Sequence, residues 1–276
     1  MAAAYRGGPG AVHEILAASL PNEQDLQRRR RVVGSSTIVG EPTCRQADRP
    51  TNGHADMRTI SVVSQKGGAG KTTIAVHLAV AAQAAGLSVA IVDMDPQASA
   101  ARWSDDRMAE EPEVVSIQPA RLAKTLDTAR AAGADLVVID TAPNADGAAL
   151  TAIRASDLVL IPCRPSAFDL AAIATTRELV RIEKKAAYIV LSAAPVRSAL
   201  VAEASAGLTA EGAQIAPVVL HNRIAFSHAV IDGRTATEYE PAGKAAEEAR
   251  ALMLWACRHV GLSPDRQADV TTLAAE

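Results

Sequence analysis

The segment that most constrains the fold is SQKGGAGKTT, residues 64–73, which lies between two apolar runs. The run before it, RTISVV, is typical of a buried strand, and the Ala-rich run that begins at Lys71 is typical of a helix. A phosphate-binding loop requires this order of strand, Gly-rich loop and helix. The common form of that loop has a Gly where this chain has Gln65, and this chain has an additional lysine, Lys66, beside the Gly pair.

The composition of this segment suits phosphate binding. Its glycines allow backbone N–H groups to approach phosphate oxygens, and the helix N-terminus adds a partial positive charge. Lys71 is expected to reach the β- and γ-phosphates, and the Thr72 hydroxyl is expected to bind Mg²⁺. The alternative, a Gly-rich turn that binds nothing, is disfavoured by the strand, the glycines and the Lys-Thr pair together. The expected nucleotide-binding residues are Gly67, Gly68, Ala69, Gly70, Lys71, Thr72 and Thr73.

From Met57 onward, short β-branched runs alternate with Ala-rich stretches. Most of these runs are almost continuously apolar, as expected of strands that are covered on both faces. The alternation predicts an α/β fold with a doubly wound, mostly parallel sheet flanked by helices, and ligands at the carboxyl ends of the strands. The expected strands are residues 58–63, 88–93, 113–117, 135–140, 157–162, 187–192 and 214–219.

Acidic side chains end two of these strands. The run SVAIVD ends in Asp93, which Asp95 follows closely, and the run DLVVID ends in Asp140. A nucleotide site needs a carboxylate at a strand end to hold Mg²⁺, and a second acid can orient the attacking water. Each acidic strand end alone is more typical of a turn. The three together, in order after a phosphate-binding loop, favour a nucleotide site.

The two ends of the chain differ from this middle part. Residues 1–56 are rich in Gly, Pro, Arg and polar side chains and contain a block of like charge at 28–31, which predicts a disordered arm. Alternatively, translation starts at Met57, because MRTISVV already begins a strand. The folded domain is expected over 57–262, with a flexible tail over 263–276.

Charge and cysteine content limit the environment. The net charge is −3 and the pI is about 6.1, so binding of nucleic acid would require a local basic patch. Cys44, Cys163 and Cys257 show neither metal-binding nor disulfide spacing, which favours a reducing cytoplasm. No apolar run is long enough to span a bilayer.

Several segments together resemble a known family. The segments QKGGAGKTT, VDMDPQ and VVIDTAP, with LVLIPCRPSAFDL and SHAVIDGRTATEYEP after them, are similar to those of the ParA/MinD P-loop ATPases with a deviant Walker A motif. The resemblance is strongest to small ParA-type partition ATPases that lack an N-terminal DNA-binding domain. It extends from about Met57 to about Val260.

The resemblance implies a role for the additional lysine. In this family it crosses the interface of an ATP-sandwich dimer and contacts the partner's phosphates, so Lys66 joins the nucleotide-binding residues, and Gln65 is no defect. The implied catalytic residues are Lys66, Lys71 and Asp95, of which Asp95 positions water. The implied Mg²⁺ ligands are Thr72, Asp93 and Asp140, and the cofactors are ATP and Mg²⁺. The division of roles between Asp93 and Asp95 stays open.

The resemblance also implies partners. It predicts a cytoplasmic, nucleoid-associated ATPase that forms an ATP-dependent homodimer, binds DNA nonspecifically and is stimulated by a ParB-like protein to segregate a plasmid or chromosome. The runner-up is a ParA-like ATPase that positions a protein cargo, and a third class is an ATP-dependent ligase or synthetase. The segment SPDRQADVTTLAAE lacks the basic and large apolar residues of a membrane-binding helix, so no membrane partner is expected.

Residues for DNA and adenine are less directly indicated. A helix over 166–185 would place Arg177, Arg181, Lys184 and Lys185 on one face, as a DNA-binding surface or as an ordinary solvated face. Arg223 is a further DNA candidate. In the segment HNRIAF, Asn222 is a candidate contact to adenine.

Replacement of Lys66 tests the role that the resemblance implies. We expect Lys66→Ala to abolish ATP-dependent dimerisation and hydrolysis, because the partner's phosphates lose a cation, while nucleotide binding by the monomer is largely kept. Light scattering with and without ATP measures the dimer. An ATP-induced dimer that persists in this variant would contradict the expectation.

Overall fold

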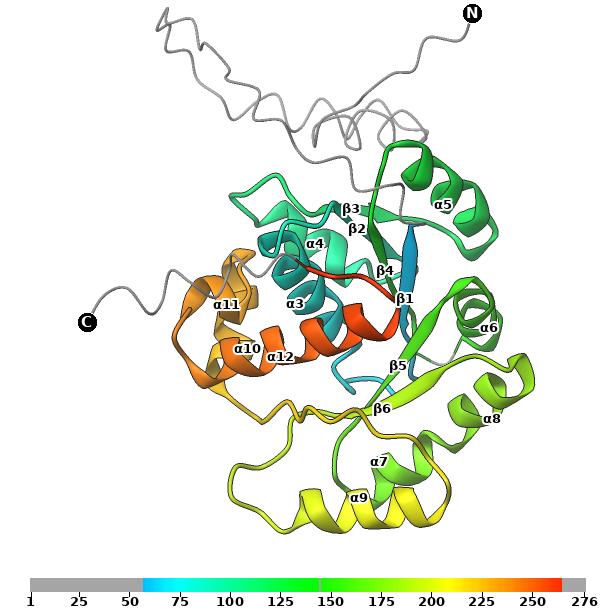
Figure 1. Cartoon of the computed structure of the whole chain (residues 1–276), viewed down its shortest axis with the longest axis vertical. Coiled ribbons are helices and arrows are strands. Elements are labelled where there is room, and N and C mark those ends of the chain that lie inside the picture. Colours follow the sequence, from blue (N-terminus) through cyan, green and yellow to red (C-terminus); the bar gives the residue numbers. More distant parts are fainter. Residues whose placement is uncertain (1–56, 144, 265–276) are drawn as a thin grey trace, which may run out of the picture.

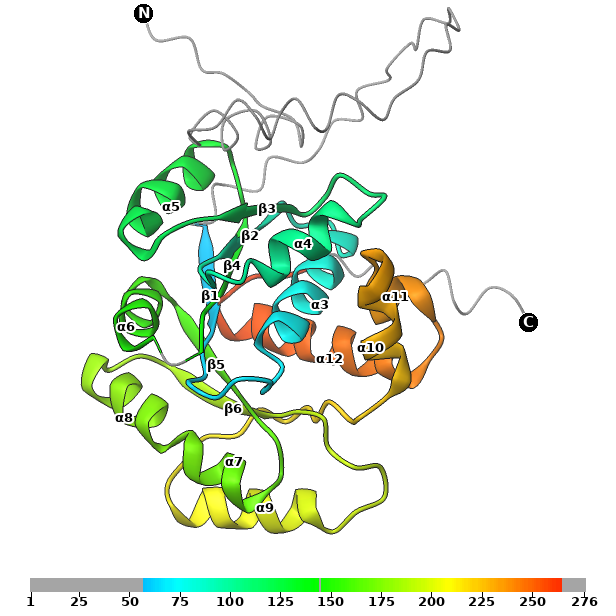
Figure 2. The same cartoon turned by 180° about the vertical axis from the view of Figure 1, so that it is seen from behind.

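The computed structural model describes residues 57–143 and 145–264. The arm predicted over 1–56 and residues 265–276 of the predicted tail lie outside the described residues. Figures 1 and 2 show a central sheet with helices on both faces. Six strands form this sheet in the order β3-β2-β4-β1-β5-β6, and every pairing is parallel. The doubly wound α/β fold predicted from the sequence is therefore confirmed.

The elements follow one another as strand and helix through most of the domain. The strands are β1 (Arg58–Val62), β2 (Val89–Asp93), β3 (Glu113–Ser116), β4 (Leu136–Asp140), β5 (Leu158–Cys163) and β6 (Ala187–Leu191). The α-helices are α3 (Lys71–Ala84), α4 (Ser99–Asp105), α5 (Leu122–Ala131), α6 (Asp146–Ala155), α7 (Ala167–Ala172), α8 (Ala174–Glu183), α9 (Leu200–Ala210), α10 (Ile224–Ala229), α11 (Ala236–Tyr239) and α12 (Lys244–His259). Short 3₁₀ turns, η1 (Pro119–Arg121) and η2 (Val230–Asp232), precede α5 and α11.

Alternate residues of each central strand enter two separate apolar layers. In β4, Val138 packs into the layer formed with α3, α10, α11 and α12. Its neighbours Val137 and Ile139 pack into the opposite layer, formed with α5, α6, α8 and α9 (Figure 2). Burial on both faces explains why these strands are continuous apolar runs rather than alternating ones. It also leaves the carboxyl ends of the strands as the place for polar chemistry.

The seventh expected strand, residues 214–219, does not form. The backbone beside β6 makes an isolated bridge between Ile189 and Ile215, with Ile189 donating to Gln214 and Ala216 donating to Ile189. The next backbone hydrogen bond to β6 is donated by Leu220 to Leu191, so the regular register, in which Val218 would donate to Leu191, is lost. The expectation from β-branched composition was wrong here because the backbone leaves the strand register after Ala216.

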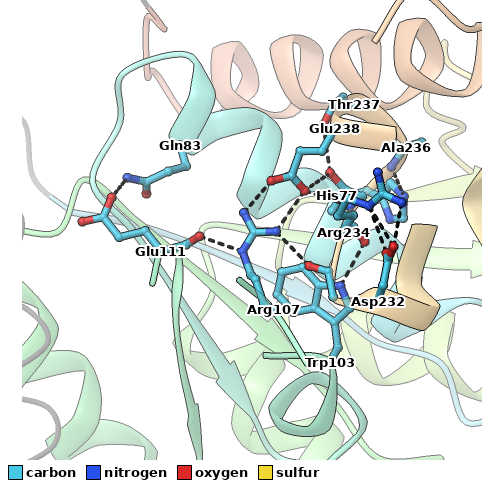
Figure 3. Close-up of polar contacts among 12 residues, drawn as sticks. His77, Gln83, Trp103, Arg107, Glu111, Asp232, Arg234, Ala236, Thr237 and Glu238 are labelled. Atoms are coloured by element: carbon cyan, nitrogen blue, oxygen red, sulfur yellow. Dashed lines mark hydrogen bonds and ion pairs between the residues drawn. The ribbon is translucent and has the colours of Figure 1, made fainter. Parts of the chain in front are cut away.

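A buried polar cluster ties α3 to the later helices (Figure 3). The His77 ring lies against the Thr73 carbonyl at 2.8 Å through Nδ1, and Nε2 accepts a hydrogen bond from the Ala236 N–H at 2.9 Å. Glu238 of α11 accepts two hydrogen bonds from the Arg107 guanidinium, at 2.9 and 2.7 Å. The first turn of α3 is thereby joined to α11, far along the chain.

The buried histidine makes stability depend on pH. Burial lowers the pKa of His77 to about 4 from 6.5, so between these values the unfolded chain binds a proton that the folded chain does not. Acidification from about pH 6.5 to 4 is therefore expected to cost about 3 kcal/mol of unfolding free energy through this group. Denaturant unfolding of the unsubstituted chain and of His77→Gln measures it. We expect the variant to lose this part of the slope, and an identical slope in both proteins would contradict the assignment.

Candidate nucleotide-binding site

The predicted phosphate-binding loop connects β1 to α3 at the carboxyl edge of the sheet. Gly68 and Gly70 have φ values of 70° and 96°, in the left-handed region that glycine adopts without a steric penalty. Gly70 is also the N-cap residue of α3, so the loop ends directly at a helix N-terminus. The loop therefore has the backbone geometry with which N–H groups bind anions.

A cavity of about 510 Å³ opens over this loop. Every predicted loop residue from Gly67 to Thr73 lines it, and so do Asp95 and Asn222. His221 and Phe226 also line it. One cavity thus reaches from the glycines to the residue predicted to contact adenine, as an extended ligand would require.

Lys71 lies buried within the curve of the loop. Its ammonium Nζ donates to the Lys66 carbonyl at 3.2 Å. Burial lowers the pKa of Lys71, although the carboxylates of Asp140 and Asp95 act in the opposite direction. An ammonium that is held out of water interacts more strongly with an incoming phosphate than a fully solvated one does.

Thr72 and Asp140 form the pair that best fits a metal ion. The Thr72 hydroxyl donates to Asp140 Oδ2 at 2.6 Å, whereas Asp140 Oδ1 is buried without a partner among the described atoms. Burial, which outweighs the Thr72 hydrogen bond, raises the pKa of Asp140 to about 7. A hydroxyl and an unpartnered carboxylate oxygen at a strand end are donors that Mg²⁺ prefers. The residues present therefore fit a magnesium ion.

Asp93 and Asp95 have different surroundings. Asp93 pairs with Asp140 in the β2–β4 register, and both of its carboxylate oxygens accept backbone N–H groups, from Asp95, Ala100 and Ala101. Burial raises the pKa of Asp93, although these three donors lower it. Asp93 thus fixes the β2–α4 turn, while Asp95 lines the cavity.

The described residues contain no group of three His, Cys, Asp or Glu side chains that could hold a metal ion by themselves. Mg²⁺ is commonly bound by one or two carboxylates together with substrate phosphates. The metal role of Asp93 stays a prediction, as does the assignment of water to Asp95.

Lys66 has an acidic partner within its own chain. Its Nζ lies 2.8 Å from Asp169 Oδ1, and the Ser166 hydroxyl also donates to the same carboxylate. Burial alone would raise the pKa of Asp169, but Lys66 and Ser166 outweigh it and hold the pKa below its usual range. Ser166 also caps α7, because its side chain accepts a hydrogen bond from the Asp169 N–H. The Lys66 side chain is still 36% exposed.

Sequence reasoning missed the residue that follows β5. The Arg164 side chain lines the cavity, and its Nη2 donates to the Gly68 carbonyl at 2.6 Å. It also missed Ser192 after β6, whose Oγ donates to the Ala69 carbonyl at 3.0 Å. Both residues follow strands that flank the loop. Their position at a carboxyl strand end, the same signal used for the acidic residues, could have identified them.

A family model for the CobQ/CobB/MinD/ParA nucleotide-binding domain matches residues 60–236. The chain belongs to this family. Protein ParA of Rhizobium radiobacter is 32% identical over 183 residues, which cover 62% of this chain and 81% of that protein. The maintenance of carboxysome distribution protein A of Gloeobacter kilaueensis is 41% identical over 121 residues, or 43% of this chain. The matched part spans 55% of the length of that relative.

Solved structures of the ParA/MinD type have the same fold. An ATP complex of McdA from Cyanothece superposes with a TM-score of 0.61 at 17% identity, over 76% of this chain and 98% of that one. At this identity the likeness concerns the fold alone. It agrees with the ParA/MinD resemblance found in the sequence, which the family match confirms.

The face predicted for DNA is not a single helical face in this ParA/MinD-type fold. The α8 helix ends at Glu183, and Lys184 adopts a left-handed conformation, so Lys184 and Lys185 lie beyond it. Lys185 instead donates to the Ser156 carbonyl at 3.0 Å. The expected helix over 166–185 is also interrupted at Ile173, between α7 and α8.

The arginines among the DNA candidates are paired with acids. Arg177 pairs with Glu211 at 2.6 Å, Arg181 with Glu178 at 2.6 Å, and Arg223 with Glu248 at 2.7 Å. The prediction that Arg177, Arg181, Lys184 and Lys185 share one face was wrong, because the chain leaves the helix before the lysines. A DNA contact by any of these residues stays a prediction.

The Thr72 hydroxyl offers a sharp test of the metal assignment in this ParA/MinD-type site. Mg²⁺ is expected to raise the affinity of the unsubstituted chain for ATP. In Thr72→Val we expect the affinity in the presence of Mg²⁺ to fall by about ten-fold or more, because one oxygen ligand is lost. Thr72→Ser keeps the hydroxyl and is the matched control. Titration calorimetry with Mg²⁺ and with a chelator measures both variants. A Mg²⁺-dependent gain that survives in the valine variant would exclude Thr72 as a ligand.

Proposed function

We propose that the protein is a Mg²⁺-dependent ATPase of the ParA type that positions a protein cargo. The observation that carries the enzymatic part is that Lys71, Thr72 and Asp95 line one cavity over the Gly-rich loop, while Asp140 lies directly behind Thr72 and accepts its hydrogen bond. Membership in the CobQ/CobB/MinD/ParA nucleotide-binding family supports it.

Each residue has a distinct task in this proposal. The loop N–H groups and Lys71 bind and orient the β- and γ-phosphates. Thr72 and Asp140 would hold Mg²⁺, which neutralises phosphate charge when bound. Asp95, which lines the cavity, orients water toward the terminal phosphate. Asn222 and Phe226 also line the cavity, and the base would be placed against them.

Lys66 ties turnover to assembly in this proposal. Its ammonium is held by Asp169 within one chain but is partly exposed, so it can exchange that carboxylate for the phosphate of a second copy. ATP then favours a homodimer in which each Lys66 serves the neighbour's nucleotide. The catalytic set of Lys66, Lys71 and Asp95 would be complete only in the dimer.

The choice of a protein cargo rests on the relatives and on the surface. The Gloeobacter kilaueensis relative is named for carboxysome distribution. The arginine candidates for DNA contact form ion pairs with Glu211, Glu178 and Glu248. These carboxylates offset the positive charge that would attract DNA phosphates. Segregation of a plasmid or chromosome with a ParB-like partner and nonspecific DNA is the second candidate. The Rhizobium radiobacter relative named ParA favours it.

The described residues contain no helix that is both long and apolar enough to cross a membrane. A nucleoid-associated, cytoplasmic location and the homodimer belong to the proposal.

Phosphate release tests the enzymatic part. We expect slow, Mg²⁺-dependent release of phosphate from ATP that rises with protein concentration, because the active unit is a dimer. The Lys66→Ala variant should lack this release. Turnover that depends instead on a small organic co-substrate would indicate a ligase or synthetase and would overturn the proposal.

Deletion of the gene in the native host tests the cargo. We expect an intracellular protein assembly to lose its regular spacing while plasmid and chromosome loss rates stay unchanged, because the cargo is not DNA. Complementation with the unsubstituted gene should restore the spacing. An increase in plasmid or chromosome loss with no displaced assembly would favour DNA partition.

A further inference from the structure

Arg164 stands where β5 ends, beside the phosphate-binding loop. The residues on both sides of it, Cys163 and Pro165, are buried and fix the backbone, whereas the Arg164 side chain is exposed to the cavity. Its Nη2 donates to the Gly68 carbonyl at 2.6 Å. A guanidinium has five N–H donors, so this contact leaves most of them for another acceptor.

Arg164 lies at the phosphate end of the cavity. The carbonyl that it contacts belongs to Gly68, and the Lys71 ammonium contacts the Lys66 carbonyl of the same loop. Arg164 and Lys71 therefore contact the same short stretch of the loop, residues 66–68. Asn222 and Phe226, which also line the cavity, come from a different part of the chain.

Arg164 is not paired with a carboxylate among the described residues. Within residues 57–143 and 145–264, no ion pair joins it to an acidic side chain, unlike the arginines at 177, 181 and 223. The charge of Arg164 contributes to the lowered pKa of Asp169, but the Asp169 carboxylate makes its direct contacts with Lys66 and Ser166. A cation whose visible partner is a neutral carbonyl retains its full charge for an anion.

We propose that Arg164 binds the terminal phosphate of the nucleotide and makes the site prefer a nucleoside triphosphate to a diphosphate; this inference rests on the proposed function. A planar guanidinium can bind two phosphate oxygens at once, which an ammonium cannot do in the same geometry. The Gly68 contact orients the guanidinium before the ligand arrives. A diphosphate lacks the group that Arg164 reaches and gains little from it.

Three variants of the full chain separate this role from a structural one. Arg164→Gln removes the charge but keeps a donor, Arg164→Lys keeps the charge but loses the planar fork, and Arg130→Gln is the matched control. Arg130 lies on α5, pairs with Asp127 at 2.8 Å and does not line the cavity. Titration calorimetry with Mg²⁺ measures binding of a nonhydrolysable ATP analogue and of ADP.

We expect Arg164→Gln to weaken the analogue by about ten-fold and ADP by less than about two-fold, because one charged contact to phosphate is lost. The affinity of Arg164→Lys for the analogue should lie between those of Arg164→Gln and the unsubstituted chain. Arg130→Gln should bind the analogue and ADP as the unsubstituted chain does. The series is repeated in Lys66→Ala, in which we expect the analogue to bind without dimerisation. The measured affinity then belongs to one chain.

Two results would overturn the inference, and they differ in meaning. If Arg164→Gln weakens the analogue and ADP equally, or weakens neither, Arg164 only shapes the loop or is irrelevant, and the proposed function stands. If the unsubstituted chain binds neither nucleotide, the proposed function fails and the inference fails with it. Circular dichroism of each variant shows whether the fold is intact.

Discussion

The hydrogen bond between the Thr72 hydroxyl and Asp140 is the contact on which the site depends. It joins the first turn of α3 to the end of β4, so the loop, the helix and the sheet meet at one point. The carboxylate is buried, with its other oxygen unpartnered among the described atoms. An unsatisfied buried acceptor costs about 1–3 kcal/mol. A bound cation, as proposed above, would offset this cost.

The two apolar layers explain why such a group can be held in place. Alternate residues of β4 enter opposite layers, so a shift of register by one residue would exchange its side chains between the two layers and disrupt the packing of both. Asp93 and Asp140 are register partners on neighbouring strands and therefore end at the same level. The polar cluster of His77 extends this rigidity to α11, since its ring lies between Thr73 and Ala236. Thr73, which lines the cavity, is thus connected to the later helices.

Much of this arrangement could be predicted from the sequence because it depends on local patterns. Continuous apolar runs marked the buried strands, and the glycines with Lys71 and Thr72 marked the loop. Asp140 could be placed because parallel strands end at a common edge. Patterns failed where the backbone departs from the regular geometry: the segment after Ala216 leaves the register with β6, and the left-handed Lys184 ends α8. The strand-end position of Arg164 was open to the same reasoning, but its contact with Gly68 and the Lys66–Asp169 pair needed the tertiary fold, because nothing local brings residues 66–68 beside residues 164–169.

The segment after β5 holds the loop from two sides, with Arg164 on the Gly68 carbonyl and Asp169 on the Lys66 ammonium. A Gly-rich loop in isolation would sample many conformations, and a ligand would have to select one of them at an entropic cost. Here the neighbouring strand has already removed much of that freedom. The cavity is therefore preorganised for its ligand, and binding energy that would otherwise order the loop remains available for affinity.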